Sequence, residues 1–160
     1  MPAIAHDKFY TPGPMARKYV GDLWRVHGMR PDDLFIKPSA GAGAFCPHLP
    51  AERLIAIDIM PEGPGIAIGA FLGFTAPDHP GRRVVIGDPP FGRNGPLARA
   101  FLRHAMSFAD IVAFILPASS AKPSMRRGID RSFHLVHWTS LAGHPSKPAM
   151  AIMRRTRCSR

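Results

Sequence analysis

The stretch Val84-Val85-Ile86-Gly87-Asp88-Pro89-Pro90-Phe91 gives the clearest indication of the fold. Its three consecutive β-branched residues predict a short strand that is buried on both faces. The strand runs directly into a turn whose two prolines fix the backbone, so that Asp88 and Phe91 stand beyond its carboxyl end. Strands buried on both faces are typical of parallel sheets covered by helices. The stretch therefore predicts an α/β protein with a special turn after one strand.

Three further apolar runs have the same form. Leu34-Phe35-Ile36 leads into the turn Pro38–Gly43, Leu54-Ile55-Ala56-Ile57 ends at Asp58, and Asp110–Leu116 stops at Pro117. Ligands of open α/β sheets bind outside the carboxyl ends of the strands. Since all the unusual residues follow predicted strands, we expect one crevice to collect them.

Helical spacing of apolar residues predicts helices over Gly13–Gly28 and Pro96–Phe108. A further helix is expected after the glycine-rich turn, with Cys46 just inside it. Three segments remain: Ile66–Leu72 fits a weak strand or a short helix, residues 119–129 fit a basic helix or a loop, and Phe133–Trp138 is a strand. Strands alternating with helices predict a mostly parallel sheet with helices on both faces.

The composition fits one soluble domain with a polyanionic partner. The 160 residues correspond to about one domain, and 46% hydrophobic with 20% charged residues excludes wholesale disorder. Lys and Arg number 21 against 11 Asp and Glu, a net charge of +10. That surplus favours nucleic acid as the partner, with a basic protein lacking such a partner as the alternative.

The sequence also sets expectations for the compartment and for metals. The longest apolar run, Ile111–Leu116, is too short to span a membrane, and no secretory signal is visible, so a cytoplasmic protein is expected. Two cysteines form no disulfide framework. The eight histidines show no metal-ligand spacing, so no metal is expected.

The turn Pro38-Ser39-Ala40-Gly41-Ala42-Gly43 and the later Asp58 have the form of a cofactor site. Glycines let a backbone approach a ligand closely. A carboxylate at the end of the next strand can accept both hydroxyls of a ribose. A plain strand-to-helix turn and a turn-capping Asp are the alternatives. The turn lacks the third glycine of Gly-x-Gly-x-x-Gly and the Gly-Lys-Ser/Thr of a phosphate loop, which disfavours a dinucleotide or a nucleoside triphosphate.

Asp88-Pro89-Pro90-Phe91 is suited to hold a planar amine. The two prolines remove amide donors, so the carbonyl groups and the Asp88 carboxylate act as acceptors. An amino group can donate to these acceptors while its ring stacks on Phe91. A rigid proline loop without this role is the alternative.

In this order, the motifs resemble those of S-adenosylmethionine-dependent adenine-N6 methyltransferases. The motifs are Phe9-Tyr10-Thr11-Pro12, Pro38–Gly43, Asp58 and Asp88-Pro89-Pro90-Phe91-Gly92, and the resemblance covers about residues 7 to 138. It is greatest to small phage- and bacterium-borne DNA methylases. It implies a Rossmann-like class I methyltransferase fold and leaves open whether the C-terminal strand pair is complete.

The resemblance also implies a role for each matching residue. The cofactor-binding residues would be Tyr10, Thr11, Pro12, Pro38, Ser39, Ala40, Gly41, Gly43 and Asp58. The catalytic residues would be Asp88, Pro89, Pro90 and Phe91. The implied cofactor is S-adenosylmethionine, and catalysis would come from orientation and proximity, without a metal or a covalent enzyme intermediate.

Three features depart from the family pattern. Lys37 stands where the family usually has an acidic residue that meets the cofactor's ammonium, so a lysine there has the wrong sign unless it points away. Ala70 stands where an Asp near the cofactor adenine is common. Beyond Trp138 the match fades, so the chain is divided into a methyltransferase domain at 1–138 and a basic tail at 139–160, in which only Ala149–Met153 could close the sheet.

The predicted function is methyl transfer from S-adenosylmethionine to the N6 amino group of adenine in DNA. Methylation of RNA adenine or of a protein glutamine is one alternative, and a decayed methyltransferase fold that only binds nucleic acid is another. A nicotinamide-dependent oxidoreductase would leave the two prolines unexplained. Since one small domain leaves no room for a recognition domain, we expect sequence specificity to be low, or to be supplied by a partner or a second copy. The sequence does not predict the oligomeric state.

Overall fold

The computed structural model describes residues 11–91, 95–122, 127, 129–140 and 147–156. Its helices and strands, in chain order, are α1 (Gly13–His27), β1 (Leu34–Pro38), β2 (Leu54–Asp58), β3 (Ile66–Ile68), β4 (Arg83–Gly87), α2 (Pro96–Phe108), β5 (Ile111–Leu116), β6 (Phe133–Ser140) and β7 (Ala149–Arg155). Short 3-10 helices lie at Cys46–His48, Ala51–Arg53, Phe71–Gly73 and Ala118–Ala121. The predicted helices over Gly13–Gly28 and Pro96–Phe108 are confirmed.

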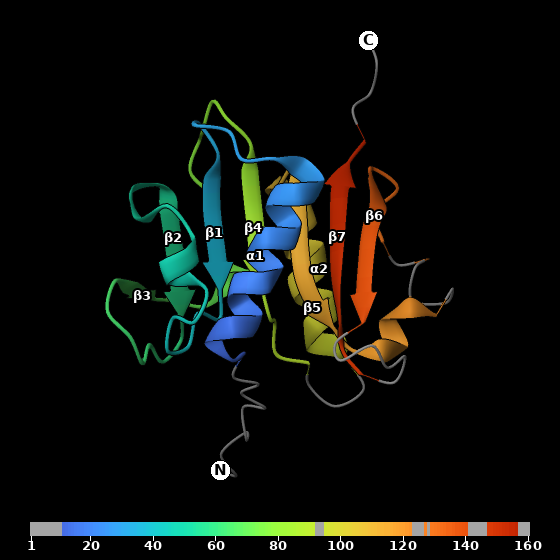
Figure 1. Ribbon diagram of the computed structural model, residues 1–160, viewed down its shortest axis with the longest axis horizontal. Coiled ribbons are helices and arrows are strands. Elements are labelled where there is room, and N and C mark those ends of the chain that lie inside the picture. The colour runs from blue at the N-terminus through green and yellow to red at the C-terminus, as the bar shows by residue number, and fades with distance from the viewer. Residues whose placement is uncertain (1–10, 92–94, 123–126, 128, 141–146, 157–160) are drawn as a thin grey trace.

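The strands form one seven-stranded sheet in the order β3-β2-β1-β4-β5-β7-β6 (Figure 1). The first five strands of this order are parallel, and β7 is antiparallel to both β5 and β6. The predicted mostly parallel sheet is therefore confirmed.

The two long helices cover opposite faces of the sheet (Figure 1). Because side chains alternate along a strand, neighbouring residues enter different cores. Phe35 and Val84 pack with Tyr19 and Leu23 of α1, whereas Ile36 and Val85 pack in the cluster that contains α2. The prediction of helices on both faces is thus confirmed.

The strand pair at the C-terminal end is complete. Residues Ala149–Met153 of β7 are at most 1% exposed, and β7 pairs with β5 along Ile111–Leu116. β6 extends past the proposed domain boundary at 138 to Ser140. The apolar segment of the basic tail is therefore an interior strand of the sheet, between β5 and β6.

The expected α-helix after the glycine-rich turn is absent, and this prediction was wrong. The segment forms only the 3-10 helices Cys46–His48 and Ala51–Arg53. Pro47 and Pro50 lack N–H groups, so an α-helix here would lose backbone hydrogen bonds. The ambiguous segment 66–72 gives both a short strand, β3, and the start of a 3-10 helix.

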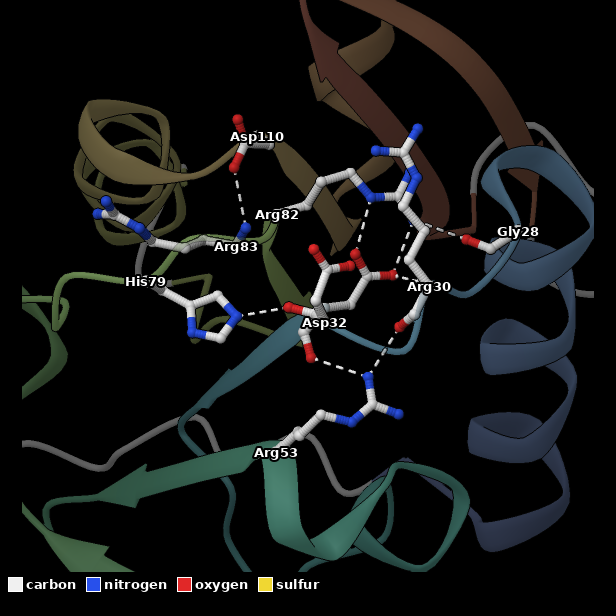
Figure 2. A network of polar contacts seen from close by, with 9 residues as sticks. Gly28, Arg30, Asp32, Arg53, His79, Arg82, Arg83 and Asp110 are labelled. Carbon is white, nitrogen blue, oxygen red and sulfur yellow. Dashed lines mark hydrogen bonds and ion pairs between the residues drawn. The ribbon is translucent and has the colours of Figure 1, made fainter.

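A buried carboxylate joins the loops at the amino ends of the strands. Asp33, just before β1, is 0% exposed and receives two hydrogen bonds from Arg82, at 2.8 and 2.7 Å. Arg82 and Arg53 approach this loop from two sides, and Arg53 donates to the carbonyl oxygens of Arg30 and Asp33 (Figure 2). Arg82 also donates to the carbonyl oxygen of Gly28, directly after α1, at 2.9 Å. The network therefore links the ends of α1, β1, β2 and β4 at the edge of the sheet opposite the glycine-rich and proline turns.

The same network lowers the pKa of Asp33. Burial opposes the charged carboxylate, but the hydrogen bonds from Arg82 and the Arg30 amide, together with the charges of both arginines, outweigh it. The carboxylate therefore stays charged at neutral pH and acts as the counterion that holds Arg82 in place.

Candidate active site

The carboxyl ends of four neighbouring parallel strands bring the predicted site segments to one edge of the sheet. β2, β1, β4 and β5 lie side by side and run in the same direction (Figure 1). Pro38 pairs with Ile57, so the glycine-rich turn and Asp58 leave the sheet at the same level. Asp88 follows β4 directly, and Pro117 follows β5. The predicted position of these segments at one edge of the sheet is confirmed, and the crevice between them stays a prediction.

The glycine-rich turn has an unusual backbone that its neighbours hold in place. Ser39, Gly41 and Gly43 all have positive φ angles, of 48°, 56° and 89°. For Ser39 this conformation is strained, since a residue with a Cβ rarely adopts it. The Ala40 amide donates to the Ile57 carbonyl oxygen at 3.0 Å, which fixes the turn to β2. Backbone strain held by neighbours in this way is typical of ligand-binding turns.

Asp58 connects the turn to the end of β2. The residue is 7% exposed, and each of its carboxylate oxygens accepts a hydrogen bond from one backbone N–H. Gly41 donates to Oδ2 at 2.7 Å, and Met60 donates to Oδ1 at 2.7 Å. A carboxylate oxygen can accept two hydrogen bonds, so both oxygens keep capacity for a ligand.

Asp88 is held by two side chains that sequence reasoning did not connect to it. Lys37 Nζ donates to Oδ1 at 2.8 Å, and Thr11 Oγ1 donates to Oδ2 at 2.6 Å. The Asp88 side chain is 10% exposed and that of Lys37 is 1% exposed. Lys37 therefore points into the site, and its charge is balanced by the very carboxylate that the motif predicts to be catalytic.

The rest of the proline turn lies against the protein interior. Pro89 is buried and Pro90 half-buried. Phe91 is half-buried and packs against both core clusters, so part of its ring is covered by the protein itself. The role of these residues toward a substrate stays a prediction.

Of the N-terminal residues predicted to bind the cofactor, the structure describes Thr11 and Pro12. Thr11 is buried and reaches Asp88, while Pro12 is exposed and accepts the first hydrogen bond of α1 from Ala16. Tyr10 lies outside the described residues. Ala70 is exposed, as the residue before the 3-10 helix Phe71–Gly73.

Exposed apolar side chains gather beside Asp58, and sequence reasoning missed them. Ile59 and Met60 follow Asp58 directly and are 48% and 61% exposed. Ile68 pairs with Asp58 in β3 and is 82% exposed, and Leu72 lies four residues further on. An apolar surface next to a carboxylate can receive a ring attached to a hydroxylated sugar.

Two negative observations apply to the described part of the chain. No helix there is long and apolar enough to cross a membrane. No group of three or more His, Cys, Asp or Glu side chains among those residues is arranged to hold a metal ion.

Comparison with known proteins finds similarity at the level of structure. No family model and no curated protein matches the sequence. A putative RNA methyltransferase, PH1948 from Pyrococcus horikoshii, superposes with a TM-score of 0.72 at 22% identity, covering 100% of this chain and 90% of that one. The magnesium protoporphyrin IX methyltransferase ChlM from Synechocystis PCC 6803, solved with bound SAM, gives 0.68 at 15% identity, with 90% and 79% covered.

A third similar structure comes from a protein complex. In the E. cuniculi Mtq2–Trm112 complex, responsible for methylation of the eRF1 translation termination factor, the matching chain gives a TM-score of 0.65 at 12% identity. The match covers 93% of this chain and 99% of that one. These likenesses and the strand order together define the fold: the chain has the Rossmann-like fold of class I methyltransferases.

Proposed function

We propose that this protein transfers a methyl group from S-adenosylmethionine to the exocyclic N6 amino group of adenine in DNA. The observation that carries the proposal is the position of Asp88-Pro89-Pro90-Phe91 at the end of β4, beside the glycine-rich turn and Asp58, in a class I methyltransferase fold. The net charge of +10 supports a nucleic-acid substrate.

The residues at the end of β2 fit the cofactor. Asp58 keeps hydrogen-bonding capacity on both oxygens for ribose hydroxyls, and the exposed side chains of Ile59 and Met60 offer an apolar surface for a ring. Gly41 has no side chain and nothing lies within 4 Å of where its Cβ would stand, so a ligand can approach the backbone of the turn there. When bound, S-adenosylmethionine supplies an electrophilic methyl group on its sulfonium.

The residues after β4 are suited to the acceptor base. Asp88 has one hydrogen bond on each carboxylate oxygen and can accept another from an amino group. Pro89 and Pro90 have no N–H groups, so at these two positions the backbone offers acceptors and no donors. On transfer the amino nitrogen gains the methyl group, the sulfonium is left as a thioether as its carbon–sulfur bond breaks, and the nitrogen releases one proton to solvent water. Asp88 and Phe91 contribute to the rate by holding that nitrogen in place. A base must leave the duplex to reach such a site.

Adenine in RNA is the second candidate acceptor. The observation that favours it is the similarity to the putative RNA methyltransferase from Pyrococcus horikoshii, which extends over the full length of this chain. RNA and DNA present the same amino group, and both carry the negative charge that a basic protein attracts.

The test is transfer of radiolabelled methyl groups to DNA, RNA and protein in parallel, followed by identification of the modified nucleoside. We expect N6-methyladenine in DNA with the wild-type protein and none with Asp88→Ala. Asp78→Ala, the same change at an exposed residue, is the matched control and should transfer at the wild-type rate. Label in RNA alone would select the second candidate, and label in protein alone would refute both.

A further inference from the structure

The net positive charge of the protein belongs to the second part of the chain. Up to and including Asp88, the sequence has nine Lys and Arg residues and nine Asp and Glu residues, so this part has no formal net charge. From Pro89 onward it has twelve Lys and Arg residues against two acids, Asp110 and Asp130. The whole surplus of +10 therefore lies in the part that forms α2, β5, β6 and β7.

The two acids of the second part lie at the edge of the sheet away from the candidate site. Asp110 directly precedes β5, and its carboxylate accepts a hydrogen bond from the Arg83 amide at 2.8 Å. Asp130 lies just before β6, whose first residue pairs with the last residue of β7, and that end of β7 lies beside the start of β5. The second part of the chain therefore provides no carboxylate at the carboxyl end of β5.

Three exposed cations follow or precede the strands at that carboxyl end. Lys122 comes directly after the 3-10 helix that follows β5. Lys147 is two residues before β7, whose first residue pairs with the last residue of β5. Arg127 is exposed as well. We call Lys122, Arg127 and Lys147 the β5-end surface.

A cavity of about 30 Å³ indicates where Arg127 lies. The cavity is lined by side chains of α2, of the end of β5, of the 3-10 helix after β5 and of the segment that follows Arg127: Ala98, Arg99, Leu102, Leu116, Ser120 and Ile129. Arg127 is two residues before Ile129, so it lies beside the same elements as Lys122. The start of α2 packs there too, since a Cβ added at Gly95 would lie 3.8 Å from the Pro117 side chain.

The β5-end surface lies next to Asp88. Gly87 pairs with Phe114, so Asp88 leaves the sheet beside the last residues of β5, and β7 is the next strand (Figure 1). Neighbouring strands are about 4.8 Å apart, which puts the start of β7 about 10 Å from the end of β4. Phosphates follow one another every roughly 3.4 Å along each strand of a duplex, so about three of them fall within this distance.

We propose that the β5-end surface binds the phosphates next to the acceptor base, so that the nucleic-acid strand crosses the ends of β5 and β7 and does not cross α1. The inference rests on the proposed function and adds the path of the substrate. Each cation that neutralises a phosphate releases counterions, which makes the affinity fall with rising salt in proportion to the number of contacts. Arg17 and Lys18 are exposed on α1, in the part of the chain without net charge, and take no part in these contacts.

The experiment measures binding of a fluorescein-labelled, adenine-containing duplex DNA to the full chain by fluorescence anisotropy at a series of salt concentrations. Combining Lys122→Gln with Arg127→Gln should reduce the slope of log K against log salt by about 1.8 and weaken binding about tenfold or more at about 0.1 M salt. Lys147→Gln alone should reduce the slope by about 0.9. The matched control combines Lys18→Gln with Arg17→Gln, which removes the same two residue types from exposed positions. It should stay within about twofold of the wild-type affinity.

The outcomes separate this inference from the proposed function. Equal losses in the two double variants would overturn the inference alone, because net charge and not this surface would then attract the DNA. A greater loss in the α1 variant would overturn it too and would indicate a path over α1. The expected losses in a wild-type protein that transfers no methyl group would refute the proposed function and support the surface. A wild-type protein that binds neither this DNA nor an RNA of the same sequence would overturn both.

Discussion

Asp88 joins three parts of the chain through its two carboxylate oxygens. Thr11 at the start of α1 and Lys37 at the end of β1 both donate to it, so the residue fixes the candidate site before any ligand binds. A group held in this way needs little reorganisation when a substrate arrives, which is how orientation contributes to a rate. Removing Asp88 would therefore disturb both the site and the fold around Lys37.

The Lys37–Asp88 pair should behave as one unit in stability measurements. Lys37→Met and Asp88→Asn each remove one partner of a nearly buried ion pair, and we expect each to cost about 3 kcal/mol in the free energy of unfolding. The double variant should cost less than the sum, with a coupling energy of about 1–3 kcal/mol. Urea denaturation of the four proteins measures the cycle, and strict additivity would show that the pair is not coupled.

Phe91 is the residue whose proposed role is separable from packing. Phe91→Leu keeps an apolar side chain between the two core clusters but removes the ring, so methyl transfer should fall about tenfold or more through lost stacking. Phe108→Leu is the control, since Phe108 is the last residue of α2, and this variant should leave transfer unchanged. Transfer rates and thermal melts of both variants check this, and a wild-type rate in Phe91→Leu would disprove the stacking role.

The sequence predicts that the candidate site residues follow strands, but it does not predict which of their side chains contact one another. Asp58 and Asp88 were correctly expected at the ends of strands, because a buried strand followed by a turn is a local pattern. The contact between Lys37 and Asp88 depends on β4 lying next to β1, a non-local pairing across 51 positions. Opposite charges at the ends of two buried strands were the available signal.

At the scale of elements, prolines explain the main error of the sequence prediction. Apolar spacing alone gave α1, α2 and the central strands correctly. The segment after the glycine-rich turn has apolar residues too, but Pro47 and Pro50 restrict it to two short 3-10 helices. The site therefore lacks a long helix at this position, and its turn depends on hydrogen bonds to β2 and Asp58 instead.

At the C-terminal end of the chain, β7 is the strand on which we expect folding to depend most. It lies between β5 and β6, and Arg155 at its end donates to the carbonyl oxygens of Met106 and Ala109 at the end of α2. A chain ending at Trp138 should therefore fail to fold, whereas one ending at Thr156 should melt like the full chain. Circular dichroism and thermal melts measure this, and a cooperative melt of the shorter chain would contradict the assignment.

At the scale of the whole molecule, buried polar groups make stability depend on pH. Burial lowers the pKa of His27 to about 4, helped by the charges of Arg154, Arg82 and His134. In the unfolded chain the pKa is about 6.5, so between pH 6.5 and 4 the unfolded state binds more protons. Stability should therefore fall by about 2 kcal/mol as the pH is lowered through this window.

His27→Gln should flatten this dependence, since glutamine does not titrate. His48→Gln, the same change at a histidine that follows the glycine-rich turn, should keep the wild-type dependence of stability on pH. Chemical denaturation at a series of pH values gives both slopes. A wild-type slope in His27→Gln would show that His27 is not responsible.

The most direct test of the central claim, that this edge of the sheet is a working cofactor site, is calorimetric titration with S-adenosylmethionine. We predict binding of one molecule per chain, weakened about tenfold or more in Asp58→Asn, because one carboxylate oxygen becomes an amide donor and the charge is lost. Absence of binding by the folded wild-type protein at millimolar cofactor, with nucleic-acid binding intact, would contradict it and identify the chain as a methyltransferase fold kept for binding alone.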